Sequence, residues 1–170
     1  MKSAFYLALF LLLIPFQASL LEPLSLAGIK PDLALALVYI IGLLTSPVEA
    51  ALVGMGSGLL LDIGSAGLVG LSGLTRGLIG LTASLLGRRM FDLANPMNGA
   101  FVAVFSLAEG ICIALFLQVV YGDVPFVSLL AGRIFPQAIY TGALGVVLLR
   151  LMTGRKVLAA LKRRGVQEEL

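Results

Sequence analysis

Residues 50–86 read AALVGMGSGLLLDIGSAGLVGLSGLTRGLIGLTASLL, an apolar, glycine-rich stretch whose only charged residues are Asp62 and Arg76. Two further charges, Glu109 and Arg133, interrupt apolar stretches later in the chain. A charge in hydrocarbon is costly, so such residues normally face protein or a water-filled cavity. Because two of the four are acids and two are bases, the sequence predicts internal pairing of Asp62 with Arg76 and of Glu109 with Arg133.

Two roles for these charges remain open from the sequence. Static pairs would fix which helices are neighbours and would need no further function. A shallow, outward-facing polar pocket, or a site of contact with a partner protein, is the alternative. Asp62 could also lie in water at the membrane interface instead of in a pair.

The composition is that of an integral membrane protein. Of the 170 residues, 59% are hydrophobic and 12% are charged, and the mean hydropathy is +1.07. A transmembrane helix needs about 20 apolar residues, so the chain has room for about five to seven spans. We expect a single all-α membrane domain. Cys112 is the only cysteine, which excludes an internal disulfide framework.

The apolar runs predict six transmembrane helices, at residues 3–21, 33–46, 50–62, 68–86, 99–121 and 126–151, and then a basic tail at 152–170. The first run resembles a signal peptide, but it is long and has no convincing cleavage site, so we expect a retained span. The third run covers only roughly 20 Å, so we expect a short helix with a glycine-rich break after it. Pro136 predicts a kink or local unwinding in the last span.

Six spans put both termini on one side of the membrane, and the basic residues favour the cytoplasmic side. Lys30 would then be the only basic residue in an outer loop. The cytoplasmic ones would be Lys2, Arg88, Arg89, Arg150, Arg155, Lys156, Lys162, Arg163 and Arg164. A five-span arrangement, which divides the basic ends between two compartments, is the alternative. The net charge of +3 thus reflects topology and contact with anionic lipid, and it does not indicate nucleic-acid binding.

Small residues recur at helical spacing in the same central stretch. Gly54 and Gly58 form one small-xxx-small pair, and Gly73 and Gly77 form another. Such faces let helices approach closely, and close packing drives helix association in lipid. The face either packs against helices of the same chain or forms a docking groove for the helix of another protein.

Motifs for catalysis are missing from the sequence. Gly70-Leu-Ser-Gly73 matches the G-x-S-G string of intramembrane serine proteases, but a serine nucleophile needs a base, and the chain contains no histidine. Zinc-protease and P-loop signatures are absent, and an aspartyl dyad needs two aspartates, whereas Asp62 is the only deep candidate. We therefore expect no catalysis, no cofactor and no bound metal.

A family resemblance covers residues 30–87. It consists of Lys30-Pro-Asp-Leu-Ala-Leu-Ala-Leu-Val-Tyr39 opening a span, Pro47 closing it, and then Gly54, Gly58-Leu-Leu-Leu-Asp62, Ser65 and Gly70. In their order and spacing these residues resemble the rod shape-determining protein MreD family. Leu86-Gly-Arg-Arg89 is similar to the basic loop of that family, and Pro136 with the basic tail is similar to its last span.

The resemblance implies a non-catalytic, multi-pass protein of the bacterial cytoplasmic (inner) membrane that acts in the elongation of rod-shaped cells. It would bind the bitopic protein MreC and act with the actin-like MreB, a polytopic peptidoglycan glycosyltransferase and a penicillin-binding transpeptidase. The implied fold is similar to the six-helix substrate-binding subunits of energy-coupling-factor vitamin transporters. The candidate partner-contact or structural residues are Pro31, Asp32, Gly54, Gly58, Asp62, Gly70, Arg76, Glu109, Arg133 and Pro136.

Two other functions fit a small helical membrane protein. One is a small-molecule-binding subunit of a vitamin transporter, which the same helix count and an outer pocket would suit. The other is a lipid-handling or small-solute channel protein. A fold alone does not decide between these, so the function has to be argued from a site.

Overall fold

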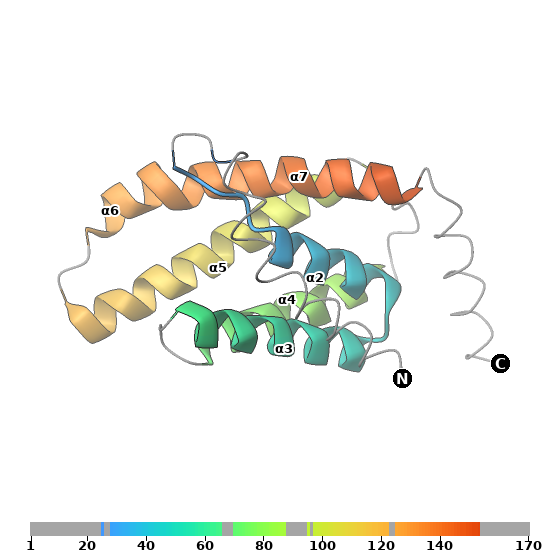
Figure 1. Cartoon of the computed structure of the whole chain (residues 1–170), viewed down its shortest axis with the longest axis horizontal. Helices are drawn as coiled ribbons and strands as arrows, with labels where there is room; N and C mark the ends of the chain where they lie inside the picture. Colours follow the sequence, from blue (N-terminus) through green and yellow to red (C-terminus); the bar gives the residue numbers. More distant parts are fainter. Residues whose placement is uncertain are drawn as a thin grey trace.

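The computed structural model describes residues 25, 28–65, 70–87, 95, 97–122 and 125–153. All elements formed by these residues are helices (Figure 1). They are α2 (Leu33–Leu44), α3 (Pro47–Ser65), α4 (Leu71–Gly87), α5 (Met97–Tyr121), α6 (Phe126–Leu129), the π-helical segment η1 (Leu130–Ile134) and α7 (Phe135–Thr153). The predicted span at 3–21 and the tail beyond residue 153 lie outside the described residues, so the count of six stays a prediction. The expected all-α fold class is confirmed for the described part.

The central helix of the fold is α2, which lies between the α3–α4 hairpin and the pair formed by α5 and α7 (Figure 1). Asp32 caps its N-terminus, because its Oδ1 atom accepts a hydrogen bond from the Leu35 N–H at 2.9 Å. The side chains of Leu35 and Tyr39 are fully buried. With 12 residues α2 covers roughly 18 Å, which is less than a bilayer core. The neighbouring helices enclose most of its surface.

The third helix is longer than expected, and the predicted short helix at 50–62 is wrong. α3 begins at Pro47, because proline is well tolerated at the first helical position, where its missing N–H would have no partner. It also continues past Asp62 to Ser65. The resulting stretch Pro47–Gly64 is long and apolar enough to cross a membrane.

Glycines form the contact between α3 and α4. A Cβ atom on Gly54 would lie 2.7 Å from the carbonyl carbon of Arg76, and one on Gly58 would lie 2.5 Å from the backbone nitrogen of Gly73. Both distances are shorter than any real contact, so only glycine lets the two backbones approach this closely. The glycine face is therefore filled by the chain's own hairpin, and the alternative of a docking groove on this face is wrong.

Residues 126–153 form one run of helix with a local defect. The chain is α-helical in α6, π-helical in η1 and α-helical again in α7. Pro136 is the second residue of α7 and has no N–H to donate to the preceding turn. π-turns are a known form of local helix irregularity, so the departure expected at Pro136 takes this form in the turn that ends two residues before it.

Three helices in the described part are long and apolar enough to cross a membrane: Pro47–Gly64, Met97–Val120 and Phe126–Leu151. Their outer faces carry large apolar side chains that are mostly exposed, such as Val48 (70%), Val119 (83%) and Val127 (77%). Exposure of such an apolar surface to water is unfavourable, whereas its contact with the hydrocarbon of a bilayer is not. The structure is that of an integral membrane protein.

Candidate functional site

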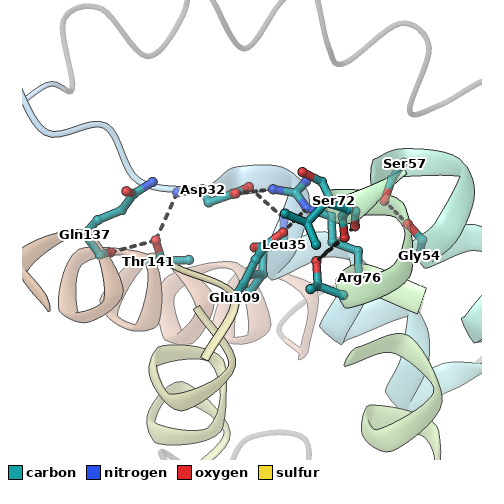
Figure 2. A network of polar contacts seen from close by, with 11 residues as sticks. Asp32, Leu35, Gly54, Ser57, Ser72, Arg76, Glu109, Gln137 and Thr141 are labelled. Carbon is teal, nitrogen blue, oxygen red and sulfur yellow. Dashed lines mark hydrogen bonds and ion pairs between the residues drawn. The ribbon is translucent and has the colours of Figure 1, made fainter. Parts of the chain in front are cut away.

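The most polar part of the interior is an ion cluster centred on Arg76. Its guanidinium forms an ion pair with Asp32 through Nη2, and its Nε donates to Glu109 Oε1 at 2.7 Å. The side chains of Arg76 and Glu109 are each 6% exposed, and that of Asp32 is 18% exposed. In Figure 2 the three side chains point toward one another from α2, α4 and α5. The cluster therefore ties three helices together.

A hydroxyl from a fourth helix joins this cluster. The Asp32 N–H donates to Thr141 Oγ1 at 3.0 Å, and the Thr141 hydroxyl donates to the Gln137 carbonyl at 2.8 Å (Figure 2). Thr141 lies in α7 and is fully buried. The N-terminus of α2 is thus held by its own aspartate, by the arginine of α4 and by the threonine of α7. This arrangement fixes the depth at which α2 begins.

The predicted ion pairs differ from those in the structure. Glu109 pairs with Arg76 and not with Arg133, which is exposed on η1 and has no ion pair among the described residues. Asp62 does not pair with Arg76 either. The predicted pairs omit Asp32 because it lies just outside the predicted span at 33–46, although it follows Pro31 and begins an apolar helix, which is the usual position of an N-cap.

Asp62 instead closes the turn between α3 and α4. Its Oδ2 atom accepts hydrogen bonds from the Gly70 N–H at 2.8 Å and the Ser72 N–H at 3.2 Å. These donors lie at the start of α4, where backbone N–H groups have no partner within the helix. Gly70 has a φ of +105°, a conformation that favours glycine. Asp62 is 4% exposed, so it does not lie in open interfacial water.

A cavity of about 110 Å³ adjoins the ion cluster. It is lined by Asp32, Ser72, Arg76, Ser106, Glu109, Gly110, Ile113, Ile134 and Gln137. The lining comes from all sides of the cluster, since it includes residues of α4, α5, η1 and α7 and the cap of α2. The structure thus brings together Asp32, Arg76 and Glu109 among the predicted site residues.

Several polar atoms that line this cavity have no partner among the described residues. Arg76 Nη1 is buried and makes no hydrogen bond. Glu109 Oε2, the hydroxyls of Ser72 and Ser106, and the side-chain amide of Gln137 also form none. Unpaired polar groups at membrane depth are costly, so they normally face water or a ligand. The cavity is therefore a polar site as well as a structural joint.

The remaining predicted residues lie elsewhere. Gly54 and Gly58 lie at the contact between α3 and α4, Gly70 lies at the turn before α4, and Pro136 lies at the start of α7. A second buried polar link was not predicted: the Tyr39 hydroxyl donates to Asn98 Oδ1 at 3.0 Å, which joins α2 to the start of α5. Asn98 lies just before the predicted span at 99–121, and its pairing with Tyr39 has no signature in the sequence.

The site has chemistry suited to binding and to fixing helices. Within the described ranges, no group of three or more histidine, cysteine, aspartate or glutamate side chains could hold a metal ion. Two carboxylates face one guanidinium, so the fully ionised cluster carries one net negative charge. A proposed function should account for three features of the site: its net negative charge, the buried Nη1 donor of Arg76 and the adjoining cavity.

Comparisons with protein-family models, with curated proteins and with solved structures find no match for this chain. The resemblance at residues 30–87 thus rests on the residues themselves. The function has to be argued from the geometry of the ion cluster and from the surface of the helices.

Proposed function

We propose that the chain is a non-catalytic membrane scaffold of the MreD family in the bacterial inner membrane. It would have both termini in the cytoplasm, bind MreC, and support lateral peptidoglycan synthesis together with MreB, a polytopic glycosyltransferase and a penicillin-binding transpeptidase. The observation that carries the proposal is the Asp32–Arg76–Glu109 cluster. Asp32 belongs to the same Lys-Pro-Asp motif that carries the resemblance, and it makes this motif the anchor of the helix bundle.

A scaffold needs fixed helix positions more than it needs a reactive group. Asp32 at the start of α2, Arg76 of α4 and Glu109 of α5 are paired with one another, so any large displacement of one helix would break these ion pairs. The glycine contacts between α3 and α4 add a second rigid joint. These two features support a body that holds a partner in a defined orientation.

The partner surface in this proposal is the outer half of α5. It exposes Phe116 (41%) and Val119 (83%) together with Leu115 and Val120, next to the exposed Val127 of α6. Aromatic residues are enriched at protein interfaces, and a single-span partner such as MreC would present one helix of matching length. This surface replaces the glycine face, which the α3–α4 hairpin already fills.

The test is co-purification of MreC with tagged variants of the chain. Phe116→Ala combined with Val119→Ala is expected to lower MreC recovery at least about fivefold, because truncation of central interface side chains commonly costs more than 1 kcal/mol each. Val48→Ala combined with Leu52→Ala on α3 is the matched control, since these side chains are also exposed and apolar. Equal MreC recovery from wild type and both double variants would contradict the proposed surface. No MreC recovery with wild type would contradict the proposed function.

A solute-binding subunit of a vitamin transporter is the second candidate, and the polar cavity is the observation that favours it. The cavity measures about 110 Å³, whereas pockets for drug-sized ligands measure about 300–1,000 Å³. A vitamin would not fit without a rearrangement of α5 and α7. Mass spectrometry of the protein after mild extraction would reveal a co-purifying vitamin, and its presence would favour this candidate over the scaffold.

A further inference from the structure

We propose that the cavity beside Arg76 binds the primary ammonium of an aminoethanol group, either as a free small amine or as the headgroup of a lipid. The site would lie within the bundle and would be separate from the partner surface on α5. This binding does not depend on the proposed function, because it uses only side chains of this chain. The charge of the cluster, the unpaired Nη1 atom of Arg76 and the size of the cavity favour this ligand.

The charge of the cluster favours a cation. Asp32 and Glu109 together carry two negative charges against the single positive charge of Arg76. A net charge enclosed by a bundle in lipid is unfavourable, so a bound group of charge +1 would neutralise the site. An anion would add to the imbalance. Arg76 is already held by both carboxylates, so it is poorly placed to compensate an additional negative charge.

The unpaired atoms match the hydrogen bonds of a primary ammonium. Such a group donates three hydrogen bonds, and four of the residues that line the cavity carry side-chain acceptor atoms: Ser72, Ser106, Glu109 and Gln137. The Arg76 Nη1 donor, which is buried without a partner, needs an acceptor of its own. A hydroxyl or ester oxygen two carbons from the ammonium supplies that acceptor, and it is the second functional group of aminoethanol.

The small size of the cavity favours a small polar group. A single water needs about 10–15 Å³ of such space, so about 110 Å³ has room for a group of a few non-hydrogen atoms. Aminoethanol has four such atoms. Choline carries three additional methyl groups on nitrogen and cannot donate hydrogen bonds from that nitrogen. The site is therefore expected to distinguish a primary ammonium from a quaternary one.

Arg133 distinguishes the two sources of the ligand. It is exposed on η1, directly before Ile134 and four residues before Gln137, both of which line the cavity. A lipid headgroup carries a phosphate next to its aminoethanol group, and an arginine at the rim suits that phosphate. A free amine has no phosphate, so its binding would not depend on Arg133.

The experiment uses the purified full-length chain in detergent, without any partner. Ethanolamine hydrochloride and choline chloride are titrated at equal ionic strength, and unfolding is followed by circular dichroism. At about ten times its dissociation constant, ethanolamine is expected to raise Tm by about 3–6 °C, whereas choline is expected to have no effect. Glu109→Gln is expected to abolish the rise, because it removes the extra negative charge. Ser106→Ala, which removes one acceptor, is expected to reduce the rise in Tm. It is the variant to use if Glu109→Gln does not fold.

Glu49→Gln is the matched control, since Glu49 lies in the first turn of α3 and does not line the cavity. This variant is expected to respond to ethanolamine as the wild type does. In a second arm, native mass spectrometry compares retention of ethanolamine and choline phospholipids by wild type and Arg133→Gln. Retention of ethanolamine lipid by wild type that is lost in Arg133→Gln identifies the lipid as the source. No retention of ethanolamine lipid by wild type, with an intact response to ethanolamine, identifies the free amine.

Three outcomes would overturn the proposal. The first is that ethanolamine and choline shift Tm equally. The second is that Glu109→Gln or Ser106→Ala responds as strongly as wild type. The third is that neither ethanolamine nor ethanolamine lipid binds, which would leave the cavity as a site for water only. Each result is obtained without MreC, so a failure here is distinguishable from a failure of the proposed function.

Discussion

Replacement of Arg76 by glutamine is expected to be the most destabilising single change in the ion cluster. Among the described residues, its guanidinium is the only cation bonded to both Asp32 and Glu109, and its side chain is 6% exposed. Glutamine would leave two buried acids without a counter-charge. Breaking a buried ion pair by removing one partner costs about 3–5 kcal/mol, which corresponds to a fall in Tm of about 6–20 °C for a chain of this size.

The changes on the acidic side are expected to be milder, for a reason that follows from the charge count. Glu109→Gln keeps an acceptor oxygen for Arg76 Nε and leaves one cation facing one carboxylate, so the expected cost is below about 1.5 kcal/mol. Asp32→Asn also removes one negative charge, and asparagine caps helices about as well as aspartate. The double variant Asp32→Asn/Glu109→Gln leaves the cation unpaired and is expected to be as unstable as Arg76→Gln.

Thermal unfolding of the purified variants in one detergent, followed by circular dichroism, measures these differences. Arg150→Gln is the control, because Arg150 is exposed in the last turn of α7 and is expected to leave Tm unchanged. If Arg76→Gln melts within about 2 °C of wild type, the cluster does not hold the bundle together. If Glu109→Gln is as damaging as Arg76→Gln, both carboxylates are needed and the charge count is wrong.

Two further changes test the contacts of the α3–α4 hairpin. Gly58→Ala is expected to lower Tm by about 2–12 °C, because the added Cβ would lie 2.5 Å from the Gly73 nitrogen, whereas Gly132→Ala meets no atom within 4 Å and is expected to be neutral. Equal Tm values for the two variants would show that the backbones are not in close contact. Asp62→Ala is expected to cost about 0.5–2 kcal/mol through loss of the bonds to Gly70 and Ser72, and Asp62→Asn is expected to retain most of that stability. Chemical or thermal unfolding measures both, and an alanine variant as stable as the asparagine variant would show that Asp62 does not cap α4.

Local patterns in the sequence predicted the positions of the helices better than they predicted the lengths of the helices. The apolar runs placed a helix in each region where the structure has one, because a chain in lipid must satisfy its backbone within helices. The sequence underestimates the length of α3, since the predicted span ends at Asp62. In the structure its carboxylate reaches the first N–H groups of the next helix, so the charge is satisfied without ending its own helix.

The pairing of the charges could not be predicted because it depends on the relative depth of helices that are distant in sequence. Arg76 and Glu109 are 33 residues apart, and Arg76 and Asp32 are 44 apart. An estimate of depth from the position of a residue along its span treats every helix as a complete span that starts at the membrane surface. α2 has only 12 residues, and its cap lies at the level of Arg76, inside the bundle. Because α2 is short and central, the carboxylate of Asp32 lies inside the bundle. A residue just before a complete span would instead lie at the membrane surface.

The same short helix accounts for the cavity. From Glu109, α5 continues to Tyr121, which is roughly 18 Å at 1.5 Å per residue, whereas on the same side α2 begins only after its cap, Asp32. Beyond this cap no residue of α2 covers α5 and α7, and the polar groups below it open into the cavity. A longer α2 would fill this space with apolar side chains and would leave Glu109 without room for a ligand. If so, an apolar side chain introduced at Ser106 should exclude ethanolamine and leave the Asp32–Arg76 pair intact.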